Sequence, residues 1–161
     1  MLKKNDSGFT LIELLIVIAI IGIIAAIAIP NLLNAVQRGK QKRTMGDMRA
    51  LATAIEAYHV DNGAFPSAAC AAGVFTTAGS ALADTSFTLL TPTYISQSPK
   101  QDGWGRFLLY NVDAGRANYN IRSHGRDGSG SAPSCGTTTD FNDDILYSNG
   151  TFLQWPEGTQ Q

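Results

Sequence analysis

A single carboxylate inside the most apolar stretch of the chain is the first candidate for chemistry. Glu13 lies between Phe9 and Ile29, in a run that carries no other charge. At the centre of a membrane an ionised carboxylate costs about 3 kcal/mol unless it is paired, so Glu13 needs a cation at the same depth. Cleavage after Gly8 would supply one, the new amine of Phe9. In the same chain this amine lies at the extreme end of the helix. A neighbouring subunit shifted along the helix axis would place its own amine better for pairing with Glu13.

The other polar side chains form no recognisable catalytic group. His59 and His124 are the only histidines, and neither has an evident nucleophile or metal cluster around it. His59, beside Tyr58 at the expected end of a helix, is interpreted as a packed or capping residue. The net charge of −1 gives no concentrated excess of lysine and arginine for tracking phosphates. We therefore predict a protein that is not an enzyme and has no nucleic-acid partner.

The chain contains two cysteines, Cys70 and Cys135, whose spacing matches no metal-binding motif. In an oxidising compartment the two would pair and close a long loop, whereas in the cytosol they would be two unrelated buried thiols. The choice depends on whether the chain is exported. We predict a Cys70–Cys135 disulfide on the export interpretation.

The apolar run from Phe9 to Ile29 is long enough to cross a membrane. As a helix it would rise roughly 31 Å, which is about the thickness of a bilayer's hydrocarbon core. A secretory signal peptide fits poorly, because the run is too long, no small-x-small site ends it, and helix-like sequence continues after Pro30. A plain membrane anchor is the alternative to a segment with a role in assembly.

Residues 31–62 continue the helical pattern with an amphipathic segment. Its apolar residues recur at steps of three and four, namely Leu32, Leu33, Val36, Met48, Leu51, Ile55 and Tyr58. Asp61-Asn62-Gly63 is predicted to end the helix, and Pro66 supports that end. The apolar stripe should pack on a globular head.

The head, residues 63–161, is predicted to be a small antiparallel sheet packed against the helix, which makes the chain α+β. Short strand candidates are separated by turns rich in glycine, asparagine and aspartate. The candidate strands are residues 107–112, 118–123, 145–148 and 151–155. The predicted organisation is thus a leader at 1–8, a transmembrane helix at 9–30, the amphipathic helix at 31–62 and the head at 63–161.

The N-terminal segment resembles the processing motif of type IV pilins and of type II secretion pseudopilins. The resemblance rests on a basic head, the Gly8-Phe9 junction, Glu13 and the uninterrupted apolar run. It implies cleavage after Gly8 by a prepilin peptidase, N-methylation of Phe9, and a role for Glu13 and the Phe9 amine in assembly. It also implies a type IV pilin-like fold.

The head resembles the C-terminal part of the major pseudopilin of type II secretion systems. The segments that carry this resemblance are Asp102-Gly103-Trp104-Gly105, the stretch 119–128 and Asp143-Asp144-Ile145. In that family the last loop binds Ca²⁺, and a hard cation does require several oxygen ligands. The resemblance therefore implies a calcium site formed by Asp127, Asp143 and Asp144, with Asp140, Asn142 and Ser129 as secondary candidates. The alternative is a solvated acidic turn in which Asp143 or Asp144 hydrogen-bonds the backbone.

We expect a structural subunit that polymerises into a periplasmic pseudopilus and drives protein secretion across the outer membrane. The resemblance implies further copies of the chain, minor pseudopilins, an inner-membrane assembly platform and membrane lipid as partners. The runner-up is a major type IV pilin of a surface fibre for adhesion, twitching or DNA uptake, which the cysteine pair favours. A monomeric membrane-tethered binding module is the third interpretation.

The expected location is the bacterial inner membrane, with a single pass and the head in the periplasm. Counting charges alone favours the reverse orientation, because more cations follow the apolar run than precede it. Lys3 and Lys4 precede it, and Arg38, Lys40, Lys42 and Arg43 follow. We place the head outside because the resemblance and the candidate disulfide both require export.

Overall fold

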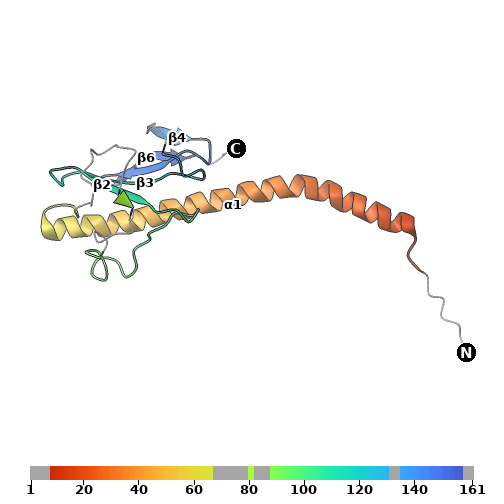
Figure 1. Ribbon diagram of the computed structural model, residues 1–161, viewed down its shortest axis with the longest axis horizontal. Helices are drawn as coiled ribbons and strands as arrows, with labels where there is room; N and C mark the ends of the chain where they lie inside the picture. Colours follow the sequence, from red (N-terminus) through yellow and green to blue (C-terminus); the bar gives the residue numbers. More distant parts are fainter. Residues whose placement is uncertain (1–7, 67–79, 82–87, 131–134, 158–161) are drawn as a thin grey trace, which may run out of the picture. The chain divides into compact units, whose positions relative to one another are not determined.

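The computed structural model describes residues 8–66, 80–81, 88–130 and 135–157. Helix α1 runs from Leu11 to Asn62 without interruption, although it contains Pro30. The chain divides into two compact units, residues 1–36 and 37–161. The described residues of the first unit belong mainly to the apolar part of α1. The second unit contains the rest of α1 and the sheet (Figure 1).

Helix α1 ends at Asn62, just before Gly63, as the sequence predicted. Gly63 has a φ of +71°, a left-handed conformation that glycine adopts without a steric penalty. Its amide donates to the carbonyl of His59 at 2.8 Å, which satisfies one of the last free carbonyls of the helix. The ring of His59 stacks on that of Phe65 at 4.2 Å, as expected for a packed residue.

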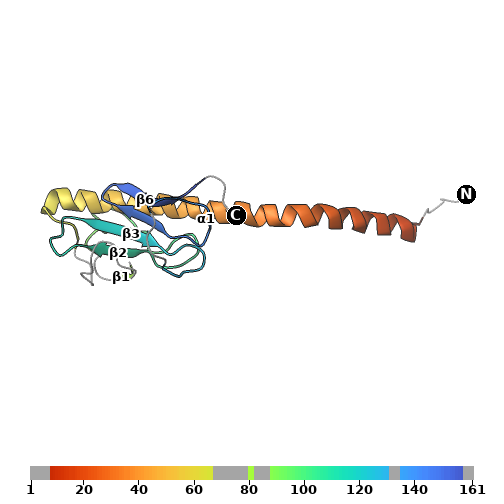
Figure 2. The same cartoon turned by 90° about the horizontal axis from the view of Figure 1, so that it is seen from above.

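The sheet has six strands among the described residues, in the spatial order β1-β2-β3-β5-β6-β4. The strands are β1 Ser80–Ala81, β2 Leu109–Val112, β3 Tyr119–Ser123, β4 Gly136–Thr138, β5 Ile145–Ser148 and β6 Thr151–Pro156. Figure 2 shows β1, β2 and β3 side by side. Asn149 and Gly150 both have positive φ, as a two-residue hairpin between β5 and β6 requires.

The four predicted strands are present, and the expected α+β arrangement is confirmed. The expectation of a purely antiparallel sheet built from these four strands was wrong at the edges of the sheet. β4 pairs with β6 in parallel, and β1 adds a short strand beside β2. Both edge strands are too short to show the alternation by which a strand is recognised in sequence.

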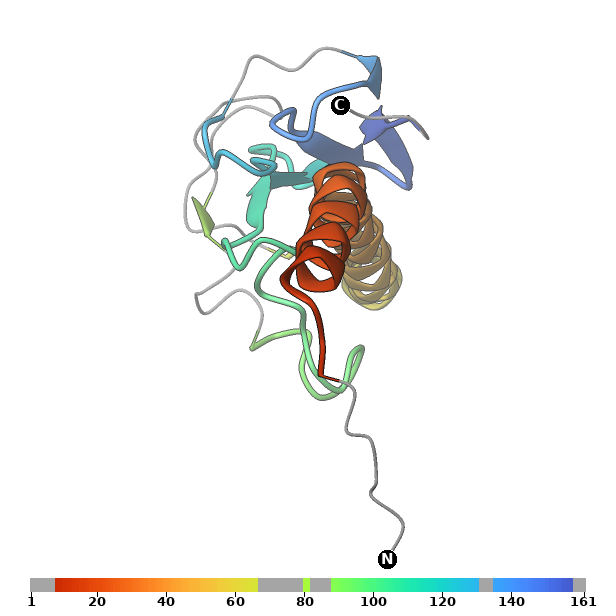
Figure 3. The ribbon, with the colours of Figure 1, turned by 90° about the vertical axis from the view of Figure 1, so that its right-hand side faces the viewer.

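The core of the second unit forms where α1 covers one face of the sheet, as Figure 3 shows for the yellow end of the helix. The helix contributes Met48, Leu51 and Ile55, all fully buried. The sheet contributes Tyr110, Tyr119, Ile121 and Ile145, and Leu90 joins from the preceding loop. The part of the predicted stripe at Leu32, Leu33 and Val36 lies in the first unit and is exposed.

One polar contact ties the helix to the middle of the sheet, and it leads to a prediction. The buried Tyr119 hydroxyl donates to a carboxylate oxygen of Glu56 at 2.7 Å. Burial, and then this hydrogen bond, raise the pKa of Tyr119 well above its usual range. Tyr119→Phe should lower the free energy of unfolding by about 2 kcal/mol, because it leaves Glu56 without this donor. Chemical denaturation would measure the loss.

Tyr147→Phe is the matched control for that change. Tyr147 is also buried, and its ring meets Phe152 edge-on at 4.8 Å, a contact that phenylalanine keeps. We expect this variant to stay within about 0.5 kcal/mol of the parent. Equal losses in the two variants would contradict the role given to the Glu56 contact.

Candidate functional site

The start of α1 is built by a reciprocal pair of hydrogen bonds between Thr10 and Glu13. The Thr10 amide and hydroxyl both donate to Glu13 Oε2, at 2.9 and 2.7 Å. In return the Glu13 amide donates to the Thr10 hydroxyl oxygen at 3.3 Å. This is a capping box, in which the first residue before the helix and the third residue within it satisfy each other's free amides. Its signal, Thr-x-x-Glu before an apolar run, is visible in the sequence, although the cap was not predicted.

The capping box sets the conformation around the predicted cleavage site. Because α1 begins at Leu11, Gly8 and Phe9 lie before the helix in non-helical chain. Gly8 is exposed, and a Cβ added to it would meet no atom within 4 Å. The Phe9 side chain is 87 % exposed. The Gly8–Phe9 bond is therefore open to an enzyme at the end of the helix.

Beyond the cap, the part of α1 that lies in the first unit of the chain presents an exposed apolar surface. An 18-residue stretch near the N-terminus is strongly apolar, and none of it is buried. Among the described residues, α1 is the one helix long and apolar enough to span a membrane. Glu13 lies one turn into this surface. An exposed apolar rod with a carboxylate near its tip gains stability by burying itself in lipid or against other apolar helices.

The Asp102-Gly103-Trp104-Gly105 segment, singled out in the sequence by resemblance, docks a loop on α1. The Gly103 amide donates to the Thr44 hydroxyl at 2.8 Å, and the Trp104 indole donates to Gln37 Oε1 at 2.7 Å. A Cβ on Gly103 would lie 2.3 Å from the Lys40 carbonyl oxygen, so only glycine fits. The segment therefore holds the loop before β2 against the helix.

Asp102 organises that loop from within. One of its carboxylate oxygens accepts the amides of Trp104 and Arg106, both at 2.9 Å. The other accepts the hydroxyl of Ser123, at the end of β3, at 2.8 Å. Because Asp102 is only 3 % exposed, these donors replace the water that its carboxylate would otherwise need.

The three predicted calcium ligands are not assembled into one site. Asp144 is 1 % exposed and forms a buried ion pair with Arg122, while Asp127 and Asp143 accept backbone amides in their own turns. The described residues contain no group of three or more histidine, cysteine, aspartate or glutamate side chains placed to hold a metal ion. This donor set does not fit the calcium site that the resemblance implies. A calcium ligand needs an accessible oxygen, whereas the Asp144 carboxylate is buried and paired with the Arg122 guanidinium.

The predicted disulfide cannot be located, because Cys70 lies outside the described residues. Cys135 is exposed just before β4. The Cys70–Cys135 pairing stays a prediction.

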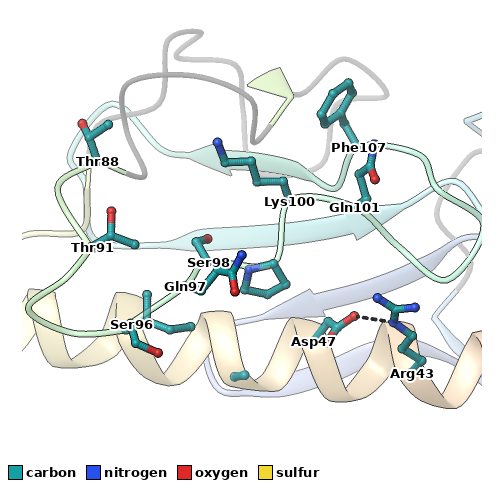
Figure 4. Close-up of a pocket in the computed structure, with 13 residues that line it drawn as sticks. Arg43, Asp47, Thr88, Thr91, Ser96, Gln97, Ser98, Lys100, Gln101 and Phe107 are labelled. Carbon is teal, nitrogen blue, oxygen red and sulfur yellow. Dashed lines mark ion pairs between the residues drawn. The ribbon is translucent and has the colours of Figure 1, made fainter.

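A polar groove of about 1040 Å³ lies beside α1 in the second unit (Figure 4). Arg43 and Asp47 on the helix form an ion pair of 3.6 Å at its edge. Lys100, Gln101 and Phe107 lie on the loop opposite. The described residues that line it include no histidine and no cysteine. The groove offers no argument for catalysis.

Comparison with known proteins finds a match for the N-terminal apolar segment and another for most of the rest of the chain. Residues 3–29 match the prokaryotic N-terminal methylation motif, and residues 31–143 match type II secretion system protein G. The second match covers more than half of the chain. The chain belongs to the type II secretion system protein G family. Membership in this pseudopilin family agrees with the exposed apolar part of α1 as a membrane anchor.

Individual relatives agree with the family. The type II secretion system core protein G of Vibrio cholerae is 30 % identical over 131 residues, which cover 78 % of this chain and 84 % of the relative. The core protein G of Pseudomonas aeruginosa is 40 % identical over 67 residues, 42 % of this chain and 47 % of the relative. The chain thus spans about half the length of that relative. The type IV major fimbrial protein FimA of Dichelobacter nodosus is 50 % identical over 60 residues, 37 % of this chain and 38 % of the relative.

Proposed function

We propose that this protein G family member is the major subunit of a periplasmic pseudopilus that drives type II protein secretion across the outer membrane. The match of residues 31–143 to protein G carries the proposal, because that stretch includes most of the described head. The exposed apolar part of α1, with Glu13 near its start, supports assembly by packing of helices. The chain acts as a structural part and not as an enzyme.

The proposed assembly mechanism uses the amine that processing creates. A prepilin peptidase cuts after Gly8 and methylates the amine of Phe9. The apolar helices of neighbouring subunits then pack together, which removes their surfaces from water and lipid. Pairing of Glu13 with the Phe9 amine of the adjoining subunit fixes the axial register, because an unpaired carboxylate in this surface is unfavourable. The capping box holds Glu13 until that amine arrives.

The proposed orientation places the head in the periplasm, with α1 crossing the inner membrane once. Besides further copies of the chain, the partners we propose are the minor pseudopilins, the inner-membrane assembly platform and membrane lipid.

A filament assay tests the proposed function. The full chain would be overproduced in cells that carry a type II secretion system lacking its own protein G. We expect restored export of the system's substrates and short fibres in negative-stain images. An absence of both polymer and export at every expression level would refute the proposal and would favour a monomeric membrane-tethered module.

A surface pilus is the second candidate, and the identity to FimA favours it. A major type IV pilin would form long fibres outside the cell without restoring secretion. The same assay separates the two, because only the pseudopilus subunit restores export. Long fibres that restore twitching in a strain without its own pilin would favour the pilus.

Gly8→Ala should prevent cleavage of the precursor. Because a Cβ at Gly8 meets nothing within 4 Å, the change leaves the protein's own fold intact and acts on recognition by the peptidase. We expect the mature form, which starts at Phe9, to fall at least about tenfold, since about 1.4 kcal/mol of lost transition-state binding is enough for that. Intact-mass spectrometry of the membrane fraction measures both forms.

Gly22→Ala is the control for that change. It adds the same methyl group in the apolar part of α1, also with no atom within 4 Å. Its precursor should be cut like the parent. Efficient production of a chain starting at Phe9 from Gly8→Ala would contradict the processing step.

A further inference from the structure

Two turns of the head meet at the place where the family resemblance implied calcium. The first, residues 123–128, begins with the last residue of β3, and the second, residues 139–144, precedes β5. Gly125, with a φ of +62°, lies so close that an added Cβ would be 2.7 Å from the carbonyl oxygens of both Asn142 and Asp143. The turns therefore touch through their backbones. Two backbone carbonyl oxygens of the second turn thus lie against the first turn.

Arg122 provides a positive charge at this junction. It is the residue before the first turn, on β3, and Asp144 is the last residue of the second. Arg122 Nε donates to Asp144 Oδ2 at 2.6 Å, and a terminal nitrogen of Arg122 contacts the same oxygen. The side chains are 2 % and 1 % exposed, so water screens this pair very little. The register of β3 and β5 places Arg122 opposite Leu146, so Asp144, two residues before Leu146, is the diagonal neighbour of Arg122.

A second arginine binds the same two turns at the surface. The Arg126 amide donates to the carbonyl of Phe141, and its Nε donates to Asn142 Oδ1, both at 2.9 Å. Its guanidinium also lies 5.9 Å from the centre of the Phe141 ring, within reach of a cation–π interaction. Each turn is thus joined to the other by a buried and an exposed arginine.

The remaining carboxylates are used within their own turns. Asp127 accepts the Ser129 amide at 2.9 Å, and Asp140 accepts the Asn142 amide at 3.0 Å. Asp143 accepts the Asp140 amide at 3.4 Å. These hydrogen bonds shape the two loops locally. A divalent cation brought to Asp144 would face the guanidinium of Arg122 and would have to compete with it for the same oxygen.

We propose that Arg122 takes the place of a divalent cation in this chain, joining the turns 123–128 and 139–144 through Asp144. The head then folds and keeps its stability without calcium, and its stability depends on the Arg122–Asp144 pair. The inference concerns how the head is held together and goes beyond the proposed function. A subunit of a pseudopilus or of a pilus could equally carry it.

The first test is a thermal melt of the full wild-type chain in detergent, followed by tryptophan fluorescence. The two tryptophans lie in the second unit, Trp104 in the loop on α1 and Trp155 on β6. We expect the same melting temperature in millimolar CaCl₂ and in EDTA, within about 1 °C. A fall of several degrees in EDTA, reversed by CaCl₂, would overturn the proposal. Normal assembly of the same preparation would leave the proposed function standing.

The second test replaces the arginines one at a time. Arg122→Gln leaves Asp144 buried without its cation, and we expect the melting temperature to fall by about 10 °C or more. Arg126→Gln removes an exposed arginine from the same junction and should lower the melting temperature by no more than about 3 °C. A fall in Arg122→Gln no larger than that in Arg126→Gln would refute the role of the buried pair.

A double variant keeps the test decisive if Arg122→Gln fails to fold. Arg122→Gln with Asp144→Asn removes both charges together, so no buried charge is left unpaired. We expect this chain to fold and to melt above the single variant. If the double variant is no more stable than Arg122→Gln, charge pairing does not hold the turns together and the proposal fails.

Discussion

Glu13→Ala is expected to keep the protein in the membrane while its incorporation into filaments falls by about tenfold or more. Removing a carboxylate from the apolar run favours insertion, because that residue is the least favourable in the span. Assembly loses the ionic contact that fixes the register, and about 1.4 kcal/mol at each subunit interface is enough for a tenfold change. Sheared filaments and membrane fractions, each quantified by immunoblot after co-expression with wild type, measure the two effects.

Glu13→Gln separates the two roles that the structure gives to this side chain. Glutamine can accept the Thr10 hydrogen bonds of the capping box, whereas it carries no charge for a neighbour's amine. If pairing with the amine sets the register, Glu13→Gln fails to assemble as Glu13→Ala does. Normal filaments from the glutamine variant would mean that the cap is what assembly needs. Wild-type filament yield from both variants would remove Glu13 from the mechanism.

Gly103→Ala is expected to destabilise the head more than an alanine at an open glycine position of α1 would. The new Cβ would lie 2.3 Å from the Lys40 carbonyl oxygen and 2.8 Å from the Lys40 carbonyl carbon and Cα. Since this is helix backbone, the loop must move away, and the contacts to Thr44 and Gln37 are lost with it. We expect a loss of about 3 kcal/mol, which lowers the melting temperature by about 6–12 °C.

Gly46→Ala is the matched control, because it adds the same methyl group to an exposed position of α1 where no atom lies within 4 Å. Alanine is the better helix former, so this variant should gain up to about 1 kcal/mol. Thermal melts of the two variants, followed by tryptophan fluorescence, therefore shift in opposite directions. A Gly103→Ala melt that matches the parent would show that the loop does not depend on this close approach.

The long elements were predictable because their signals are local. The period of apolar residues and the glycine at position 63 defined the helix, and Asn149-Gly150 marked the turn between β5 and β6. The carboxylate in the apolar run and the Gly8–Phe9 junction also stand out in the sequence. Each of these features depends on residues within a few positions of one another, and their meaning is fixed by helix geometry, turn sterics or the energy of a charge in lipid.

Only the tertiary structure decided which partners the polar residues take. Asp144 could have joined a metal site or paired with a side chain, and its use by Arg122, 22 residues away, follows from the register of β3 and β5. Gly103 had no visible reason to be glycine until the loop was placed against Lys40. The parallel pairing of β4 with β6 likewise joins strands that the local pattern cannot relate. These choices depend on burial and on distances between remote segments, which packing alone sets.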